Sequence, residues 1–150
     1  MTAAPAFAPV TVSVSAPGRT GAPAAGGLRS RRGRMACLSG AMAEDAVARH
    51  LQGRGAVILA RRWRGLAGEI DLICRQGDCI VFVEVKQAAT HGEAAARLGA
   101  AQQARICRAA CEFCEGLPGG QLTEMRFDAA LVDRLGRIEI LENAFGDCFA

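Results

Sequence analysis

The stretch GEIDLICRQGDCIVFVEVK, residues 68–86, decides the fold. Apolar residues alternate along both of its halves, which indicates two β-strands, and Gly77-Asp78 between them suits a two-residue reverse turn. With that turn, Gln76 pairs with Cys79. The stretch therefore predicts an antiparallel β-hairpin with one wholly apolar face.

Charged residues occupy the other face of this hairpin. The predicted register places Asp71 opposite Glu84, and Glu69 opposite Lys86. Directly paired side chains on an antiparallel ladder have Cβ atoms about 4.5–5.5 Å apart, and two carboxylates at that distance repel unless a proton or a cation lies between them. The pattern favours a divalent metal site, with a solvated surface and a Glu69–Lys86 ion pair as the alternative.

Lys86 is the only lysine of the chain. A lysine ammonium acts as a point charge beside a reacting water or phosphate, which the planar guanidinium of arginine does not. The carboxylates of Asp71 and Glu84 are hard oxygen donors that suit Mg²⁺ or Mn²⁺, and no histidine or cysteine stands among them to favour zinc. These residue types therefore favour chemistry at the hairpin.

The segments around the hairpin resemble a known family. Asp71 followed by Glu84-Val85-Lys86 matches the D…ExK pattern of restriction-endonuclease-like nucleases. The wider context consists of SGAMAEDAVARHL (39–51), ILARRWRGLAGEIDLI (58–73), RFDAALV (126–132) and ENAF (142–145). In that order and spacing these segments closely resemble the YraN-like family, bacterial proteins predicted to be nucleases.

The resemblance implies an α/β fold with a restriction-endonuclease-like core, in which helices flank a central mixed β-sheet. The order of the hydrophobic patterns agrees with that architecture. The elements that we expect are helix 39–53, strand 56–63, the hairpin 68–86, a loop, helix 100–116, strand 126–133 and strand 137–141.

Two further residues join the predicted site. Glu44 lies on the apolar stripe of helix 39–53, where an unpaired charge is costly, so it needs Lys86 or a metal-bound water as partner. The alternative is a glutamate at the edge of the stripe that reaches solvent. The resemblance implies that Glu44 reaches the metal centre and that Gln103, a glutamine after the ExK strand, supports the site. Gln102 stands where the family usually has a basic residue.

The leading hypothesis is a metal-dependent nuclease that hydrolyses phosphodiester bonds. Asp71, Glu84 and the Val85 carbonyl would bind Mg²⁺ or Mn²⁺, and Lys86 would orient water or stabilise developing charge. The alternative is a nucleic-acid-binding protein of the same fold without appreciable cleavage, which the absence of the usual basic residue at Gln102 favours. DNA is favoured over RNA as partner, and a homodimer is an option because many nucleases of this fold are dimers.

Basic residues gather next to the hairpin, although the net charge is only +3. Arg61, Arg62 and Arg64 surround Trp63 and would suit a nucleic-acid backbone with one stacking surface. An arginine-rich surface around a core tryptophan is the alternative.

Asp128 stands at a position typical of the family. We expect a structural role, in which Asp128 pairs with Arg126 on its own strand face.

Residues 1–34 differ in composition from the expected domain at 35–150. They contain no Asp or Glu and gather arginines in LRSRRGR, so we expect a disordered arginine-rich tail, or a true start at Met35 or Met42. The tail has no secretory-signal pattern, and no segment has the roughly 20 apolar residues that cross a membrane. We expect a soluble, cytoplasmic protein without a membrane partner.

Cys107, Cys111 and Cys114 form a C-x3-C-x2-C pattern within the expected helix 100–116. On one side of a helix, thiols pack as small hydrophobic groups, so we expect free thiols. An iron–sulfur cluster with Cys37 or Cys148 as a fourth ligand is the alternative.

Overall fold

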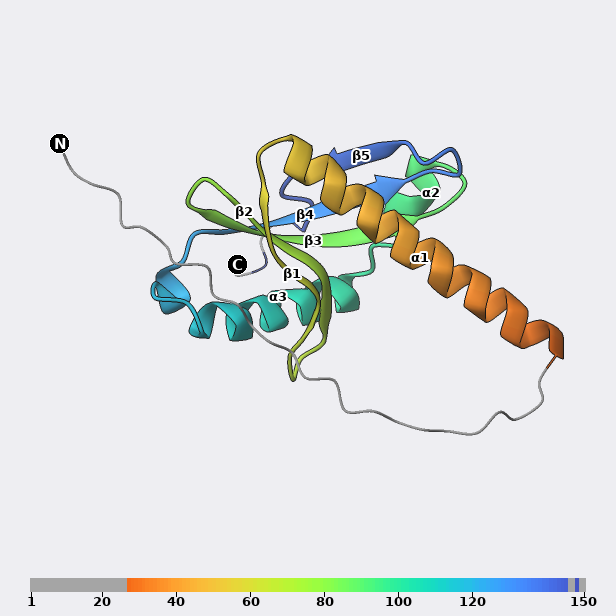
Figure 1. Ribbon diagram of the computed structural model, residues 1–150. Coiled ribbons are helices and arrows are strands. Elements are labelled where there is room, and N and C mark those ends of the chain that lie inside the picture. Colours follow the sequence, from red (N-terminus) through yellow and green to blue (C-terminus); the bar gives the residue numbers. More distant parts are fainter. Residues whose placement is uncertain (1–26, 146–147, 149–150) are drawn as a thin grey trace.

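The computed structural model describes residues 27–145 and Cys148. Figure 1 shows a sheet with a long helix on one side and a shorter one on the other. The elements are α1 (Gly27–Gly53), β1 (Val57–Arg64), β2 (Glu69–Gln76), β3 (Cys79–Gln87), α2 (His91–Ala95), α3 (Ala100–Glu115), the 3₁₀-helix η1 (Gly120–Leu122), β4 (Met125–Val132) and β5 (Ile138–Leu141).

The five strands form one sheet in the order β1-β2-β3-β4-β5. β3 and β4 are parallel, whereas the other neighbours are antiparallel, so the sheet is mixed. Parallel neighbours need a long crossover, and α2 and α3 lie in the connection from β3 to β4. The structure therefore confirms the expected α/β fold, which is compatible with a restriction-endonuclease-like core.

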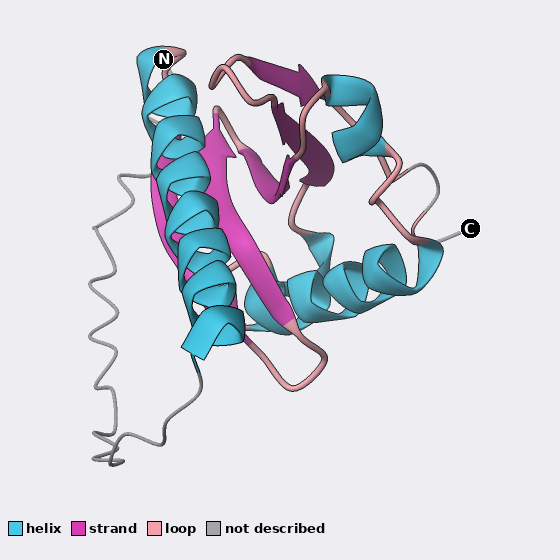
Figure 2. Ribbon diagram, turned by 90° about the vertical axis from the view of Figure 1, so that its right-hand side faces the viewer, coloured by secondary structure: helices cyan, strands magenta, loops and turns pink. Residues whose placement is uncertain are grey.

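The two faces of the sheet bury separate hydrophobic clusters. Leu72 and Val83 pack with Val47 of α1 on one face, and Ile73 and Phe82 pack with α3 on the other. Figure 2 shows the same arrangement from the side, with the sheet between the two helices. Side chains alternate along a strand, so Asp71 and Glu84 come to the α3 face.

The central hairpin has the predicted register. Gln76 pairs with Cys79, and Leu72 pairs with Val83. Gly77 has a φ of 59°, a conformation that glycine adopts without the steric cost of a Cβ atom. One side chain departs from the predicted faces, because Ile70 joins the cluster against α3 instead of the one against α1.

The helix predicted at 39–53 begins earlier than expected, since α1 starts at Gly27. Residues 27–34 of the expected tail are therefore helical, and residues 1–26 lie outside the described part of the chain. Among the residues of α1 whose burial the structure describes, from Ser39 on, Ala43 is the first that is buried in the core. Among the described residues, no helix is long and apolar enough to cross a membrane. The short helix α2 occupies the segment expected to be a loop.

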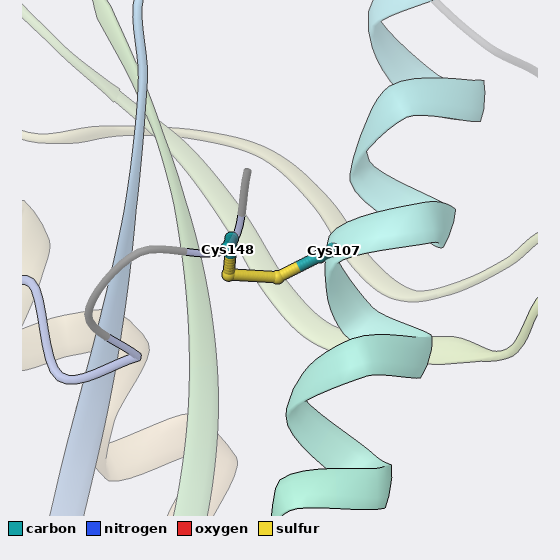
Figure 3. The surroundings of a disulfide bond; sticks show 2 residues. All are labelled: Cys107 and Cys148. Atoms are coloured by element: carbon teal, nitrogen blue, oxygen red, sulfur yellow. A yellow bond between two sulfur atoms is a disulfide. The ribbon is translucent and has the colours of Figure 1, made fainter. Parts of the chain in front are cut away.

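A disulfide joins Cys107 of α3 to Cys148, with Cα atoms 6.1 Å apart and a sequence separation of 41 (Figure 3). The expectation of free thiols is therefore wrong for these two residues. The signal was not available in the sequence, because cysteine connectivity depends on which helix the C-terminal segment meets. The cysteines described as free are Cys74, Cys79, Cys111 and Cys114.

Candidate functional site

Asp71 and Glu84 lie side by side on neighbouring strands. Leu72 pairs with Val83, so the next position of the ladder brings Asp71 opposite Glu84, as predicted. Asp71 Oδ2 accepts a hydrogen bond of 2.8 Å from the backbone N–H of Val85. The negative charge of Glu84 acts on Asp71, because two carboxylates that lie next to each other repel.

Two effects together raise the pKa of Asp71 to about 7. Burial is the larger one, and the negative charge of Glu84 is the next. The N–H of Val85 acts in the opposite direction by stabilising the carboxylate, but burial and repulsion outweigh it. Below about pH 7, Asp71 therefore keeps a proton that a solvated carboxylate would release. A divalent cation would relieve the same repulsion.

Two donors fix the carboxylate of Glu84, which is almost fully buried. Lys86 Nζ lies 2.8 Å from Glu84 Oε1, and Gln102 Nε2 donates a hydrogen bond of 2.5 Å to the same oxygen. Lys86 thus contacts Glu84, two residues away on its own strand, and not Glu69, which pairs with Arg64. The alternative of a Glu69–Lys86 surface ion pair is therefore wrong.

Gln102 contacts Glu84, whereas the sequence pointed to Gln103. Gln103 Nε2 instead donates to the carbonyl oxygen of Leu98, within the turn that precedes α3. Successive residues of a helix point about 100° apart, so the starting point of α3 relative to the sheet decides which glutamine faces the strands.

Glu44 has a partner other than the one expected. Its carboxylate accepts hydrogen bonds from Arg62, at 2.7 Å from Nε and 3.4 Å from Nη2. The negative charge of Glu44 still contributes to the raised pKa of Asp71, which places the two carboxylates in one electrostatic cluster. Glu44 is half-buried and has Arg62 as its partner, so the predicted contact with Lys86 is wrong.

Arg62 is close to the carboxylates of both Glu44 and Asp71. Arg61 pairs with Leu72 and Trp63 pairs with Ile70, so Arg62 between them is opposite Asp71. The hydrogen bond from Arg62 to Glu44 raises the arginine pKa, and the charge of Asp71 adds to the effect. Arg62 has a φ of 47°, a conformation that costs a residue with a Cβ atom about 1 kcal/mol or more. The ion pair with Glu44 offsets that cost and fixes the guanidinium beside the site.

The other residues predicted to bind nucleic acid are also engaged. Arg61 pairs with Asp45, and Arg64 pairs with Glu69. The ring of Trp63 packs edge-on against Phe113, with centroids 5.5 Å apart. Trp63 is thus a part of the hydrophobic cluster under α3, which favours the alternative of a core tryptophan within an arginine-rich surface.

A hollow of about 450 Å³ opens over the carboxylate pair. Its wall includes Glu69, Asp71, Glu84, Gln102, Arg105 and Ile106. Arg105 is exposed and forms no ion pair with any described residue. Sequence reasoning missed it, although its position three residues after Gln102 on α3 places both on one helix face. It supplies the uncompensated positive charge of the hollow.

The donor atoms fit a hard divalent cation. Glu84 Oε1 and Asp71 Oδ2 are taken by protein donors, which leaves the second oxygen of each carboxylate for another partner. Paired carboxylate oxygens suit Mg²⁺ or Mn²⁺. No cluster of three or more His, Cys, Asp or Glu side chains suited to a metal occurs in the described part of the chain, so water or substrate oxygens would supply the remaining ligands. The role of the Val85 carbonyl stays a prediction.

Asp128 is structural, as expected. Both of its oxygens accept 2.8 Å hydrogen bonds from Arg126, and Oδ1 also accepts from the backbone N–H of Asn143. Asp128 is fully buried, and its partners compensate the charge. This cluster ties β4 to the segment after β5 and stands apart from the carboxylate pair.

Comparison with known proteins gives a single family. The model of Uncharacterised protein family UPF0102 matches residues 43–132. A UPF0102 protein of Cereibacter sphaeroides is 56% identical over 113 residues, which are 75% of this chain and 97% of the relative. UPF0102 proteins of Ruegeria pomeroyi and Dinoroseobacter shibae are 56% and 49% identical over 115 residues, 77% of this chain in each case and 94% and 86% of the relatives. The matched residues include β1 to β4 and the carboxylate pair, and the chain belongs to the UPF0102 family, whose YraN-like motifs its sequence carries.

Proposed function

We propose that this protein is a metal-dependent nuclease that hydrolyses phosphodiester bonds of nucleic acid, DNA before RNA. The observation that carries the proposal is the placement of Asp71 opposite Glu84 in the wall of an open hollow, with Lys86 Nζ 2.8 Å from Glu84. Carboxylate pairs in contact with a lysine suit a divalent cation next to a reacting water.

Asp71 and Glu84 would hold Mg²⁺ or Mn²⁺ through their second oxygens. A bound cation of this kind polarises a phosphoryl oxygen and lowers the pKa of a bound water. The chain prepares the ligands for it, because the Val85 N–H orients Asp71 and the amide of Gln102 orients Glu84. Gln102 is in this sense a positioning residue.

Positive charge in and around the hollow would receive the phosphate. Lys86 places an ammonium group beside Glu84, where it can stabilise the charge that develops on the phosphate. Arg105 of α3 adds an exposed side chain to the wall of the hollow. A guanidinium binds phosphate with two parallel hydrogen bonds, so Arg105 is suited to position the backbone.

Nucleic-acid binding without cleavage is the second candidate. The small number of metal-binding side chains favours this candidate. The described residues include no group of three or more His, Cys, Asp or Glu that could hold a metal ion. The ion pairs of Arg61, Arg62 and Arg64 act against both candidates, because phosphate must compete with a carboxylate for each guanidinium.

Calorimetric titration with Mn²⁺ tests the metal site without a choice of substrate. We expect binding by the wild-type protein and none by Asp71→Asn, because the amide replaces a charged ligand without a change in shape. Asp78→Asn is the matched control, since Asp78 is exposed in the turn of the same hairpin. Equal binding by the wild-type protein and Asp71→Asn would exclude the site.

A further inference from the structure

The loop between β1 and β2 presents a leucine to solvent on a fixed backbone. Leu66 is fully exposed, and the loop projects past α3 (Figure 1). The N–H of Gly65 donates to the carbonyl of Gly68 at 2.9 Å, which closes the turn. The carboxylate of Glu112 on α3 accepts from the N–H groups of both Leu66 and Ala67, at 2.7 Å each.

The turn is also pressed against its neighbours at Gly65. A Cβ atom at this position would lie 2.5 Å from Glu112 Oε2 and 2.7 Å from the ring of Trp63, so a larger residue would require these side chains to shift. Three hydrogen bonds and this close contact fix the backbone of residues 65–68, although the side chain of Leu66 is fully exposed to solvent. A single exposed leucine is ordinary, but here the surrounding residues hold its backbone in one place.

The turn that carries Leu66 leads directly into the wall of the hollow. Gly68 and Glu69, the residues that follow the turn, line the hollow together with Asp71 and Glu84. A Cβ atom on Gly68 would lie 3.7 Å from Cβ of Arg105, so the end of the turn lies against the base of the Arg105 side chain. The turn thus carries an apolar tip next to the group that we propose to bind phosphate.

We infer that Leu66 is a wedge that enters the base stack of DNA bound over the carboxylate pair, an inference that rests on the proposed nuclease function. Arg105, in the wall of the hollow, would contact phosphates, while the leucine side chain lies against base faces. Apolar side chains inserted between base steps unstack them at a cost of a few kcal/mol per step. That cost is smallest where stacking is already interrupted, so the wedge predicts preference for duplexes with a gap or an unpaired base.

The test compares Leu66→Ser with Leu135→Ser. Leu135 is a matched control because it is also exposed, at 70%, and also lies in a turn whose N–H a carboxylate holds, that of Asp133. Its turn joins β4 to β5, at the opposite edge of the sheet from β1. Both substitutions remove apolar surface from solvent and leave the core intact, so both proteins should fold.

The measurements are affinity for a continuous and a gapped DNA duplex, with Ca²⁺ in place of Mg²⁺, and fluorescence of 2-aminopurine placed beside the gap. We expect the wild-type protein and Leu135→Ser to bind the gapped duplex about tenfold more tightly than the continuous one and to raise the fluorescence by unstacking. Leu66→Ser should bind both duplexes with equal affinity and leave the fluorescence unchanged.

The outcomes separate the wedge from the proposed function. One outcome is that the wild-type protein and Leu66→Ser bind DNA with the same preference for the gapped duplex and the same change in fluorescence. That result would overturn the wedge and leave the nuclease proposal standing. Absence of DNA binding by the wild-type protein would overturn both. A change of oligomeric state in Leu66→Ser, measured by light scattering, with unchanged duplex preference would assign the leucine to a protein contact and also overturn the wedge.

Discussion

Replacement of Asp71 by asparagine should change the pH dependence of stability. The pKa of Asp71 rises from 3.8 to about 7 on folding. Between these values the native protein keeps a proton that the unfolded chain has already released. Stability therefore falls as the pH rises through this window, because the native state must give up a proton that it binds more tightly.

The magnitude follows from the size of the shift. From pH 5 to the native pKa of about 7 there are about two pH units, each worth about 1.4 kcal/mol, so this carboxyl contributes about 3 kcal/mol at pH 5 and almost nothing at pH 8. Asparagine resembles the protonated acid at every pH: its oxygen can accept from the Val85 N–H and its amide can donate to Glu84. The contribution should therefore become independent of pH in Asp71→Asn.

Urea unfolding at pH 5, 6, 7 and 8, with a chelator present, measures this effect. We expect the free energy of unfolding of the wild-type protein to fall by about 3 kcal/mol more than that of Asp71→Asn over this range. Asp78→Asn, in the exposed turn of the hairpin, should retain the wild-type dependence. The same pH slope in the wild-type protein and Asp71→Asn would refute the raised pKa of Asp71.

Three further predictions follow from the other contacts. Lys86→Arg should lower DNA cleavage by about 100-fold or more and leave DNA binding in Ca²⁺ unchanged, because a planar guanidinium cannot replace the ammonium beside Glu84; equal cleavage by both proteins would exclude a catalytic role. Cys148→Ser should lower the free energy of unfolding by about 4 kcal/mol under oxidising conditions, from the loss of a cross-link over 41 residues, and a dithiol reductant should erase the difference; a difference that persists in reductant would assign the loss to packing. A chain that begins at Met35 should melt within about 2 °C of the full-length protein, as measured by circular dichroism, because Ala43, Val47, Ala48 and Leu51 of α1 lie in the core and all remain in the shortened chain; a larger loss would show that the removed residues support the fold.

The hairpin was the most predictable part of the molecule, for a local reason. Side chains alternate with a period of two, and the Gly77-Asp78 turn leaves one register, so the convergence of Asp71 and Glu84 follows from about twenty residues of sequence. The pairing of Arg126 with Asp128 is equally local, since the two residues share one face of β4.

The remaining partners depend on contacts between elements, which the sequence pattern does not contain. Gln102 and not Gln103 reaches Glu84 because the rotation of α3 against the sheet decides between neighbours. Glu44 pairs with Arg62 because α1 crosses β1, at a residue with an unusual backbone conformation. Arg105 could have been found as the residue one helical turn from Gln102, but its lack of an acidic partner becomes visible only in three dimensions.

The central claim is that the carboxylate pair of Asp71 and Glu84 binds a divalent cation and hydrolyses nucleic acid. The most direct measurement is cleavage of gapped duplex DNA in Mn²⁺ by the wild-type protein and by Asp71→Asn, with Asp78→Asn as control. We expect the wild-type protein and Asp78→Asn to cut the DNA, a chelator to stop both, and Asp71→Asn to leave the DNA intact. Intact DNA with the wild-type protein, or cleavage by Asp71→Asn at the wild-type rate, would contradict the account.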